Sequence, residues 1–536
     1  MCTNIVLDLV VGMLDIAFLG FLLLVINFYT VNNTAHNSFL SQSLTNKNSL
    51  VVVGLFFMLF SLKNYLGYRV SKAQNFFFYN IASRLSKRNI WHYLNDDYTK
   101  FINIDSSIFT RKISQQPIEF SSYILTNIQQ VISQSILIFF TIIGILFYHP
   151  KSFLSLFLLL VPPVILLAFL IKKKLKQVRA SIKVSSQKTI QHLQESLSGY
   201  VESNIYDKNA FFVDRFYEYK QQLDENIATQ QTLQILPSRL IEVFAVLGFF
   251  ILIAINKLSA NAPAIDLLTI GIFMAAAYKI IPGIIKILNS TGQMKTYQFT
   301  LDDLSLPVNK TPATVLKAAS SPISSLKFDQ LYFKYNDHTV LNGINFQLAP
   351  GDFAGMSAAS GKGKTTVINL LLGFLKPDGG GVCFNDRKTG SEEKQQYWGR
   401  ISYVKQQPFF IHDTILKNIT LCDKGYDKAK LEEVLAFCGV NELLDKYSEG
   451  LEKIIKENGK NISGGQRQRI MLARALYHDF DLLILDEPFG ELDDHSEKQI
   501  LANLAALANK GKMIMFITHK KASLSFCNKI LSLDEE

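Results

Sequence analysis

The stretch Ser360-Gly361-Lys362-Gly363-Lys364-Thr365-Thr366 forms a glycine-rich turn between two apolar runs in the second half of this sequence. The preceding run, 353–357, has the composition of a buried strand, and the following run, 365–374, has that of a helix. A strand, such a turn and a helix N-terminus together surround phosphate groups with backbone N–H donors. The pattern predicts an α/β nucleotide-binding domain in which Lys364 reaches the β and γ phosphates and Thr365 binds magnesium.

One position of this loop departs from the usual phosphate-binding pattern, which begins with glycine. The sequence has Ala358 there. If the backbone needs a positive φ at this position, the extra Cβ costs about 1 kcal/mol, which weakens the loop without abolishing it.

A second phosphate-site element is Leu482-Leu483-Ile484-Leu485-Asp486-Glu487, an apolar run that ends in two carboxylates. Such a run is typical of a buried parallel strand, and ligands of open α/β sheets lie at the carboxyl ends of the strands. We expect Asp486 to hold magnesium through water and Glu487 to polarise the attacking water as general base. An ordinary strand end is the alternative, which the upstream Lys364 disfavours.

The composition indicates that part of the chain lies in lipid. The 536 residues suggest two or three domains, 40 of them are Phe, and the formal charge is +10. This positive charge is concentrated beside apolar runs, which favours an anionic membrane over nucleic acid as the partner. The five cysteines lack the paired spacing of a zinc site or disulfide framework.

Six apolar stretches in the first half are each long enough, at roughly 20 residues, to cross a bilayer. They predict about six transmembrane helices, near residues 6–29, 49–68, 121–148, 152–172, 239–257 and 265–289. A soluble helical bundle would need polar stripes, which the run Leu154 to Ile171 lacks. The long segments after the second and fourth stretches are rich in Lys and Arg, so the positive-inside rule predicts that both termini are cytoplasmic.

The long cytoplasmic segments are expected to continue the helices beyond the lipid, with a short turn near 105–118 and another near 203–216 that either dock on the nucleotide-binding domain or face water. Inside the spans, Asp15, Lys63 and Lys279 are ionisable residues that contact substrate, a partner or an interface, or reach water by snorkelling. Pro162-Pro163 and Pro282-Gly283 predict kinks in two helices.

A polar linker separates the two halves. The predicted domains are a transmembrane domain over 1–302, a linker over 303–325 and an α/β P-loop ATPase domain over 326–536.

One further string identifies a family. Ile462-Ser463-Gly464-Gly465-Gln466-Arg467-Gln468-Arg469 resembles the signature of ABC-transporter ATPases and lies shortly before the Asp486 strand. A serine and glycines at a helix start form an anion-binding nest, so the nest of one chain closes over ATP held by another chain. Resemblance to this family implies that Ser463, Gly464, Gly465 and Gln466 bind nucleotide.

Other motifs of the family follow in order. Tyr335 resembles the aromatic residue that stacks on adenine, Gln406 the glutamine that senses magnesium and the membrane domain, and His519 the switch histidine that contacts the γ-phosphate. Asp493 retains the end of the dimer-contact loop, although Gly490-Glu491 stands where the family commonly has Ser-Ala. The effect of Glu491 on communication between sites stays open.

The resemblance implies an exporter-type half-transporter with ATP and Mg²⁺ as cofactors. The membrane domain precedes the ATPase, and Glu457 resembles the acidic residue before the signature in exporters. Two chains are required to complete a site, which implies a homodimer or a pair with a related half-transporter, in a bacterial inner membrane with membrane lipids as partners and the ATPase domain in the cytoplasm.

Three functions compete: ATP-driven export or flipping, a membrane ATPase that gates or senses, and a soluble ATPase acting on nucleic acid, which the spans exclude. The segment 276–282 resembles the sixth span of bacterial lipid-linked oligosaccharide flippases and of polysaccharide and peptide exporters. The substrate class therefore stays open among lipid, glycolipid and peptide.

Overall fold

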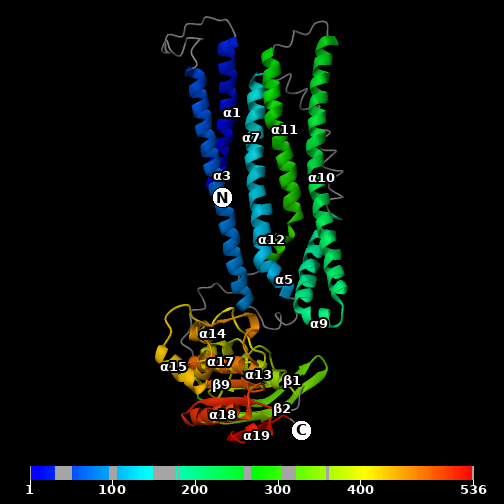
Figure 1. The fold of residues 1–536 in the computed structure, drawn as a ribbon. Coiled ribbons are helices and arrows are strands. Elements are labelled where there is room, and N and C mark those ends of the chain that lie inside the picture. The colour runs from blue at the N-terminus through cyan, green and yellow to red at the C-terminus, as the bar shows by residue number, and fades with distance from the viewer. Residues whose placement is uncertain are drawn as a thin grey trace. The chain divides into compact units, whose positions relative to one another are not determined.

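The computed structural model describes residues 2–30, 51–95, 106–148, 177–178, 180–258, 267–304, 321–357 and 361–533 (Figure 1). The chain divides into two compact units, the first ending at Asn309 and the second running from Lys310 to Glu536. This division falls inside the segment 303–325 that the sequence marks as a linker. We describe each unit by itself.

The first unit is helical throughout its described part. Its elements are α1 (Cys2–Thr30), α3 (Val51–Asn95), α5 (Ser106–Thr110), η1 (Arg111–Gln115), α6 (Gln116–Glu119), η2 (Phe120–Leu125), α7 (Thr126–Tyr148), a helix over 180–198, α9 (Tyr200–Ile205), α10 (Asn209–Leu258), α11 (Leu267–Thr296) and α12 (Phe299–Leu304).

The apolar stretches predicted to cross the membrane are helical wherever they are described. The stretch 152–172, which contains Pro162-Pro163, lies wholly outside the described residues, as do 49–50 and 265–266 at the starts of two others. By length and composition alone, Val51–Asn95 and Ser106–Ile143 qualify as spans among the helices that could be searched. At 45 and 50 residues, α3 and α10 are much longer than a bilayer requires, so both extend beyond it as expected.

The two predicted turns differ in outcome. Near the second, Tyr206 to Lys208 break the helix between α9 and α10, with Asp207 at φ 54°, as predicted. The first turn was predicted at Asp105-Ser106-Ser107, and this is wrong for the two serines, which begin α5; the described residues 106–118 are helical and include the π-helical turn η1 just before Pro117. Asp105 lies outside the described residues. The wider π turn accommodates a proline, which removes a backbone donor from the helix.

Helix α7 packs against both α1 and α11. Gly283 follows Pro282 within α11, and a Cβ on it would lie 2.9 Å from Ile138 Cδ1 of α7, so glycine permits this close approach. Farther along the same two helices, Asn127 Nδ2 donates to Gln293 Oε1 at 2.9 Å. Small residues and polar side chains thus hold the pair together, as is common between helices in lipid.

The second unit is built on a parallel sheet in the order β11-β3-β10-β9-β6. These strands are β11 (Lys529–Ser532), β3 (Phe353–Ser357), β10 (Met513–Ile517), β9 (Leu482–Asp486) and β6 (Ile401–Val404). Every residue of β9 and β10 is buried, which explains why both are almost continuously apolar.

An antiparallel sheet, ordered β2-β1-β4-β5, forms a second layer. It comprises β1 (Leu326–Tyr335), β2 (His338–Leu348), β4 (Gly379–Phe384) and β5 (Arg387–Lys388), and the short pair β7 (Asp413–Thr414) and β8 (Ile454–Ile455) stands apart. The remaining elements are α13 (Lys364–Leu372), η4 (Glu393–Arg400), α14 (Ile415–Thr420), α15 (Lys428–Phe437), α16 (Asn441–Leu444), η5 (Gly450–Glu452), η6 (Glu457–Gly459), α17 (Gly464–Tyr477), α18 (Asp494–Asn509) and α19 (Lys521–Leu524).

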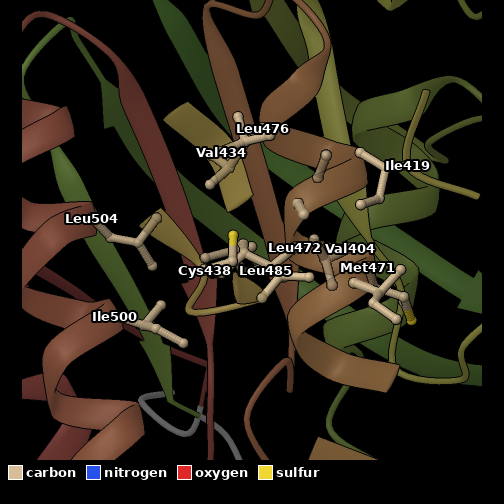
Figure 2. Packing of buried hydrophobic residues seen from close by; sticks show 14 of the residues in the cluster. Val404, Ile419, Val434, Cys438, Met471, Leu472, Leu476, Leu485, Ile500 and Leu504 are labelled. Atoms are coloured by element: carbon tan, nitrogen blue, oxygen red, sulfur yellow. The ribbon is translucent and has the colours of Figure 1, made fainter. Parts of the chain in front are cut away.

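Two apolar cores lie on the two faces of the parallel sheet. One packs α13 and the antiparallel sheet around residues such as Val367, Ile368 and Phe384. The other packs α14, α15, α17 and α18 against the sheet, where Leu472 and Leu485 meet in the middle of the cluster shown in Figure 2. With both faces covered, the sheet presents polar groups only at its ends, which is where the candidate site lies.

Candidate active site

The N-terminus of α13 has the geometry of a phosphate-binding loop. Gly361 and Gly363 adopt φ of 83° and 88°, and a Cβ on Gly363 would also approach Val340 Cγ1 to 2.8 Å. Glycine is therefore required at Gly363 for both conformation and space. Ala358 and Ser360 lie outside the described residues, so the predicted cost of Ala358 and the predicted contact of Ser360 remain predictions.

The two hydroxyl residues at the start of α13 differ in exposure. Thr365 is exposed and Thr366 is 5% exposed. Only Thr365 is thus presented to solvent at the helix start, where the sequence assigns it to magnesium, and Thr366 belongs to the buried base of the loop.

The strand ends of β9 and β10 bring the acidic pair to the same edge as α13. Ile517 pairs with Asp486 in the parallel register, and the Glu487 N–H donates to the Ile517 carbonyl at 3.0 Å. Glu487 adopts φ 49°, in the left-handed region that is uncommon for residues other than glycine. This bend turns Glu487 out of the strand, whereas Asp486 stays buried.

A network of side chains converges on the Glu487 carboxylate. The Lys364 Nζ donates to Oε1 at 2.9 Å, His519 Nε2 lies 2.8 Å from the same oxygen, and Gln406 Nε2 donates to Oε2 at 2.8 Å. Lys364 Nζ also contacts His519 Nε2. Four residues that the sequence selected from separate motifs are therefore brought together in one cluster.

The acidic neighbours have opposite pKa shifts. Burial acts to raise the pKa of Glu487, but the hydrogen bond and charge of Lys364, together with His519 and Gln406, outweigh it and bring the pKa below 4.5. Burial, followed by the charge of Glu487, raises the pKa of Asp486 above 3.8. Glu487 is thus held ionised near neutral pH, as a general base must be.

Tyr403 is a site residue that the sequence did not identify as such. Its hydroxyl donates to Asp486 Oδ2 at 3.3 Å, and this hydrogen bond partly opposes the upward pKa shift of Asp486. Tyr403 lies one residue before the end of β6, which pairs in parallel with β9. The position of an aromatic hydroxyl beside a neighbouring strand end was the available signal.

The predicted signature forms the N-terminus of α17. Ser463 and Gln466 make a reciprocal capping box, in which the Ser463 N–H donates to Gln466 Oε1 at 2.9 Å and the Gln466 N–H donates to Ser463 Oγ at 3.4 Å. Gln466 therefore orders the helix start in this chain, in addition to the nucleotide contact predicted for it.

Glu491 lies directly over this helix start. A Cβ at Gly464 would overlap the Glu491 carboxylate, and Gly465 lies against the Glu491 backbone carbonyl. The carboxylate pairs with Arg467 Nη2 at 3.2 Å, and the Glu491 N–H donates to Gln468 Oε1 at 3.0 Å. Glu491 and Arg467, which were given no site role from sequence, are thus part of the local structure around the signature.

The two remaining predicted site residues have simple surroundings. Asp493 caps α18 by accepting the Ser496 N–H at 2.9 Å. Tyr335 is 49% exposed at the end of β1, and its ring meets Phe333 edge to face with centroids 4.8 Å apart. This leaves an accessible aromatic face, consistent with stacking on a base. The side chain of Glu457 lies outside what the structure describes.

Comparison with known families covers both halves of the chain. Residues 1–276 match the model described as the ABC transporter transmembrane region, and residues 341–490 match the model described as ABC transporter. The match to the membrane region covers slightly more than half of the 536 residues.

Three curated relatives carry one description, "ATP-dependent lipid A-core flippase". The protein from Bordetella pertussis is 26% identical over 416 residues, which span 76% of this chain and 66% of the relative. The Burkholderia orbicola protein is 24% identical across 82% of this chain and 75% of its own length. The Saccharophagus degradans protein is 32% identical over 230 residues, which span 43% of this chain and 39% of the relative.

Among solved structures, a bacterial Atm1-family ABC exporter with ATP bound is similar to this chain with a TM-score of 0.81. The match covers 99% of this chain and 93% of the exporter chain at 16% sequence identity. At that identity the likeness concerns the fold.

Proposed function

This chain belongs to the ABC transporter family, and from that premise we propose that it uses ATP hydrolysis to export or flip an amphipathic substrate across a membrane. The proposal rests above all on the cluster of Lys364, Glu487, His519 and Gln406 at one sheet edge, in a chain that also carries a transmembrane region. Side chains arranged in this way are suited to the hydrolysis of a phosphoanhydride bond. The transmembrane helices provide the membrane process that the released energy would drive.

Glu487 is the general base of the proposed hydrolysis. Its carboxylate now accepts from Lys364 and Gln406, so ATP binding must draw the lysine toward the phosphates and leave the carboxylate to take a proton from water. His519, whose side chain is 45% exposed, lies beside both groups and would donate a hydrogen bond to the γ-phosphate. Exchange of the Lys364 contact from Glu487 to phosphate thereby couples nucleotide binding to base activation.

The same edge offers oxygen donors suited to Mg²⁺. The exposed Thr365 hydroxyl, the Gln406 amide carbonyl and the Asp486 carboxylate are oxygen ligands of the type that this hard cation prefers, with Asp486 acting through water. When bound, Mg²⁺ would neutralise charge on the phosphate oxygens of ATP.

A second chain completes the proposed site. The start of α17 offers backbone N–H groups from Gly464 and Gly465, and Ser463 stands at its N-cap, so the helix can face a γ-phosphate carried by a partner. Since this chain supplies both the base and the signature, a homodimer with two active sites is the simplest assembly. Pairing with a related half-transporter is the alternative.

The names of the relatives support a lipid or glycolipid as the substrate. We further propose a bacterial inner membrane as the location, with the ATPase domain and both termini in the cytoplasm, because the long segments between the predicted spans are rich in Lys and Arg. A membrane ATPase that gates or senses is the competing function. It would hydrolyse ATP without moving a substrate.

Reconstitution in sealed vesicles separates these functions. Lipid bound to the purified Glu487→Gln variant is identified by mass spectrometry and then supplied to wild-type vesicles. We expect ATP-dependent movement of that lipid from one leaflet to the other, with no movement by Glu487→Gln. Hydrolysis by the wild type without movement of any copurified molecule would reject export and favour the gating function.

A further inference from the structure

A small cavity with both polar and apolar lining lies between α1 and α7 of the transmembrane unit. Its volume is about 110 Å³. From α1 it is lined by Asp8, Gly12 and Asp15, whose spacing of four and three residues places them on one face of the helix, and by the apolar residues Leu9, Val11 and Met13. From α7 it is lined by Ser133, Gln134, Ile136, Leu137 and Phe140.

The close approach of the two helices fixes this cavity. A Cβ on Gly12 would lie 2.7 Å from Leu137 Cδ1, so the helices are in contact at this level. The cavity is therefore a recess beside a tight helix contact, and a larger residue at Gly12 would separate its walls.

The lining is acidic among the described residues: it contains two carboxylates and neither Lys nor Arg. One carboxylate, Asp15, forms an ion pair with Lys63 of α3, whose ammonium is also 4.9 Å from the Phe60 ring centroid. Counting Asp8, Asp15 and Lys63 as ionised gives a net charge of −1. A single positive charge on a ligand would balance this site, which lies toward the predicted cytoplasmic end of the span 6–29.

The cavity also contains an unsatisfied buried hydroxyl. Ser133 is 5% exposed, and its Oγ has no hydrogen-bond partner in the described part of the chain. Buried polar atoms of this kind generally have a partner in protein, water or ligand. The Ser133 hydroxyl carries an oxygen acceptor, which together with the carboxylates suits a ligand rich in N–H donors.

Size and shape narrow the ligand further. A cavity of about 110 Å³ is several times the roughly 10–15 Å³ that one water requires, so it admits a small headgroup and not an acyl chain. A primary ammonium brings three donors and one positive charge, and an aromatic ring such as Phe140 is a favourable neighbour for it. A phosphate or carboxylate would instead be repelled by Asp8.

We propose that this cavity binds the ammonium group of an amine-bearing amphiphile that the transporter moves. This inference rests on the proposed export function and specifies its substrate class: a lipid or glycolipid with a primary amine on its polar part. Asp8 supplies the balancing charge, Ser133 accepts a hydrogen bond, and the Asp15–Lys63 pair holds α1 and α3 in register beside the cavity.

Native mass spectrometry of the full-length transporter tests this proposal. The protein is held in nanodiscs made of phosphatidylglycerol, a lipid without an amine, and is released from them in the mass spectrometer. The protein is titrated with dodecylammonium and, separately, with dodecyl sulfate. We expect Asp8→Asn to weaken dodecylammonium binding by about tenfold or more, the effect of losing a hydrogen bond to a charged group, with Asp8→Glu near wild type and Ser133→Ala intermediate. Asp224→Asn makes the same change in charge on the exposed part of α10 and should leave binding unchanged.

A competition with ethylammonium distinguishes the sources of the amine. Displacement of dodecylammonium at equal concentration would assign the cavity to a free small amine, and displacement only at large excess would assign it to the headgroup of an amphiphile. Both results retain ammonium recognition.

Equal binding of dodecylammonium by wild type and Asp8→Asn overturns the proposal, as does a loss of dodecyl sulfate binding in Asp8→Asn that matches the loss of dodecylammonium. If Asp8→Asn does not purify as a monodisperse protein, Ser133→Ala and Asp8→Glu decide, since equal weakening in both would also reject it. The measurement uses no nucleotide. If dodecylammonium binding depends on Asp8 but no transport is found, the export function is rejected and the binding site is retained. If transport is found but Asp8→Asn binds dodecylammonium as wild type does, the ammonium site in the cavity is rejected and the export function is retained.

Discussion

The ATPase domain contains two glycine-flanked helix N-termini, at α13 and α17, and the charges around them are opposite. At α13 the first helical residue is Lys364, which is 8% exposed and directed to the acidic strand end. At α17 the carboxylate of Glu491 lies against Gly464 and is held there by Arg467. A helix N-terminus attracts anions in both places, but only α13 is accompanied by a cation poised for phosphate.

This difference indicates that the anion-binding start of α17 is covered by an acidic side chain of the same chain, Glu491. A γ-phosphate from a partner chain would meet the Glu491 carboxylate unless the loop at 490–493 moves. We therefore expect the α13 side to control whether ATP is hydrolysed and the α17 side to control how readily two ATPase domains close on it.

The largest effect is expected at the α13 side from Glu487→Gln. The amide cannot take a proton from water, although it can still contact Lys364 and Gln406, so the hydrolysis rate should fall by about 10²- to 10⁴-fold while ATP remains bound. Phosphate release and retention of labelled ATP measure the two effects. Glu432→Gln, the same change on the exposed face of α15, is the control and should behave as wild type. Wild-type turnover by Glu487→Gln would show that Glu487 is not the general base.

A smaller loss is expected from His519→Ala. The imidazole lies 2.8 Å from Glu487 Oε1 and next to Lys364, and its removal takes away one hydrogen bond to a charged group. Such a bond corresponds to roughly 1.5–3 kcal/mol, or about 10- to 100-fold in turnover, with little change in ATP affinity. Single-turnover hydrolysis and nucleotide binding separate the two. His495→Ala, at the start of α18, is the matched control.

On the α17 side we expect a substitution to favour, not impair, the ATP-dependent closure of two ATPase domains. Glu491→Ala removes a negative charge from the helix start and leaves Arg467 near the incoming phosphate. A charge at a helix terminus is worth typically 0.3–1 kcal/mol, so the ATP concentration that closes the dimer should fall about two- to fivefold. The comparison uses the hydrolysis-deficient background and measures dimerisation of the ATPase domains in the full-length protein.

Glu442→Ala provides the control for that result. Glu442 also pairs with an arginine of α17, Arg469 at 3.3 Å, but it does not lie over Gly464. Equal effects of the two substitutions would mean that only the overall charge matters, and a rise in the required ATP with Glu491→Ala would show that Glu491 supports closure.

The grouping of residues on the α13 side could be predicted from sequence because each element carries its own pattern. The strand is apolar over 482–485 since both faces of the sheet are covered, and the carboxylates that follow lie at its carboxyl end, where Glu487 contacts Lys364. The Glu491 contact could not be predicted in this way. It depends on the path of a short loop over Gly464, and no periodicity encodes where a loop side chain comes to rest.

The membrane domain shows the same limit. Length and apolar composition were sufficient to locate those of its helices that the structure describes, but the pairing of Asp15 with Lys63 and the cavity beside Asp8 depend on how helices distant in sequence rotate against each other. The turn expected at Asp105-Ser106-Ser107 does not extend to the two serines because the polar composition there is compatible with a helix, and the helix that follows accommodates Pro117 through a π turn.

The smallest predicted effect concerns Tyr403, which connects the edge strand β6 to the magnesium side of the α13 site. Tyr403→Phe removes the hydroxyl that donates to Asp486 Oδ2 at 3.3 Å. This hydrogen bond favours the ionised carboxylate, so its loss raises the pKa of Asp486 further above 3.8. Protons then compete better with Mg²⁺ as the pH falls, and the Mg²⁺ concentration for half-maximal hydrolysis should rise by roughly twofold at acidic pH and converge with wild type as the pH rises. Tyr397→Phe is the control, because the Tyr397 ring stacks on Phe384 with centroids 4.5 Å apart and has no contact with Asp486 in the described residues, so it should show no such dependence. A pH-independent defect in Tyr403→Phe would indicate that Tyr403 acts through packing alone.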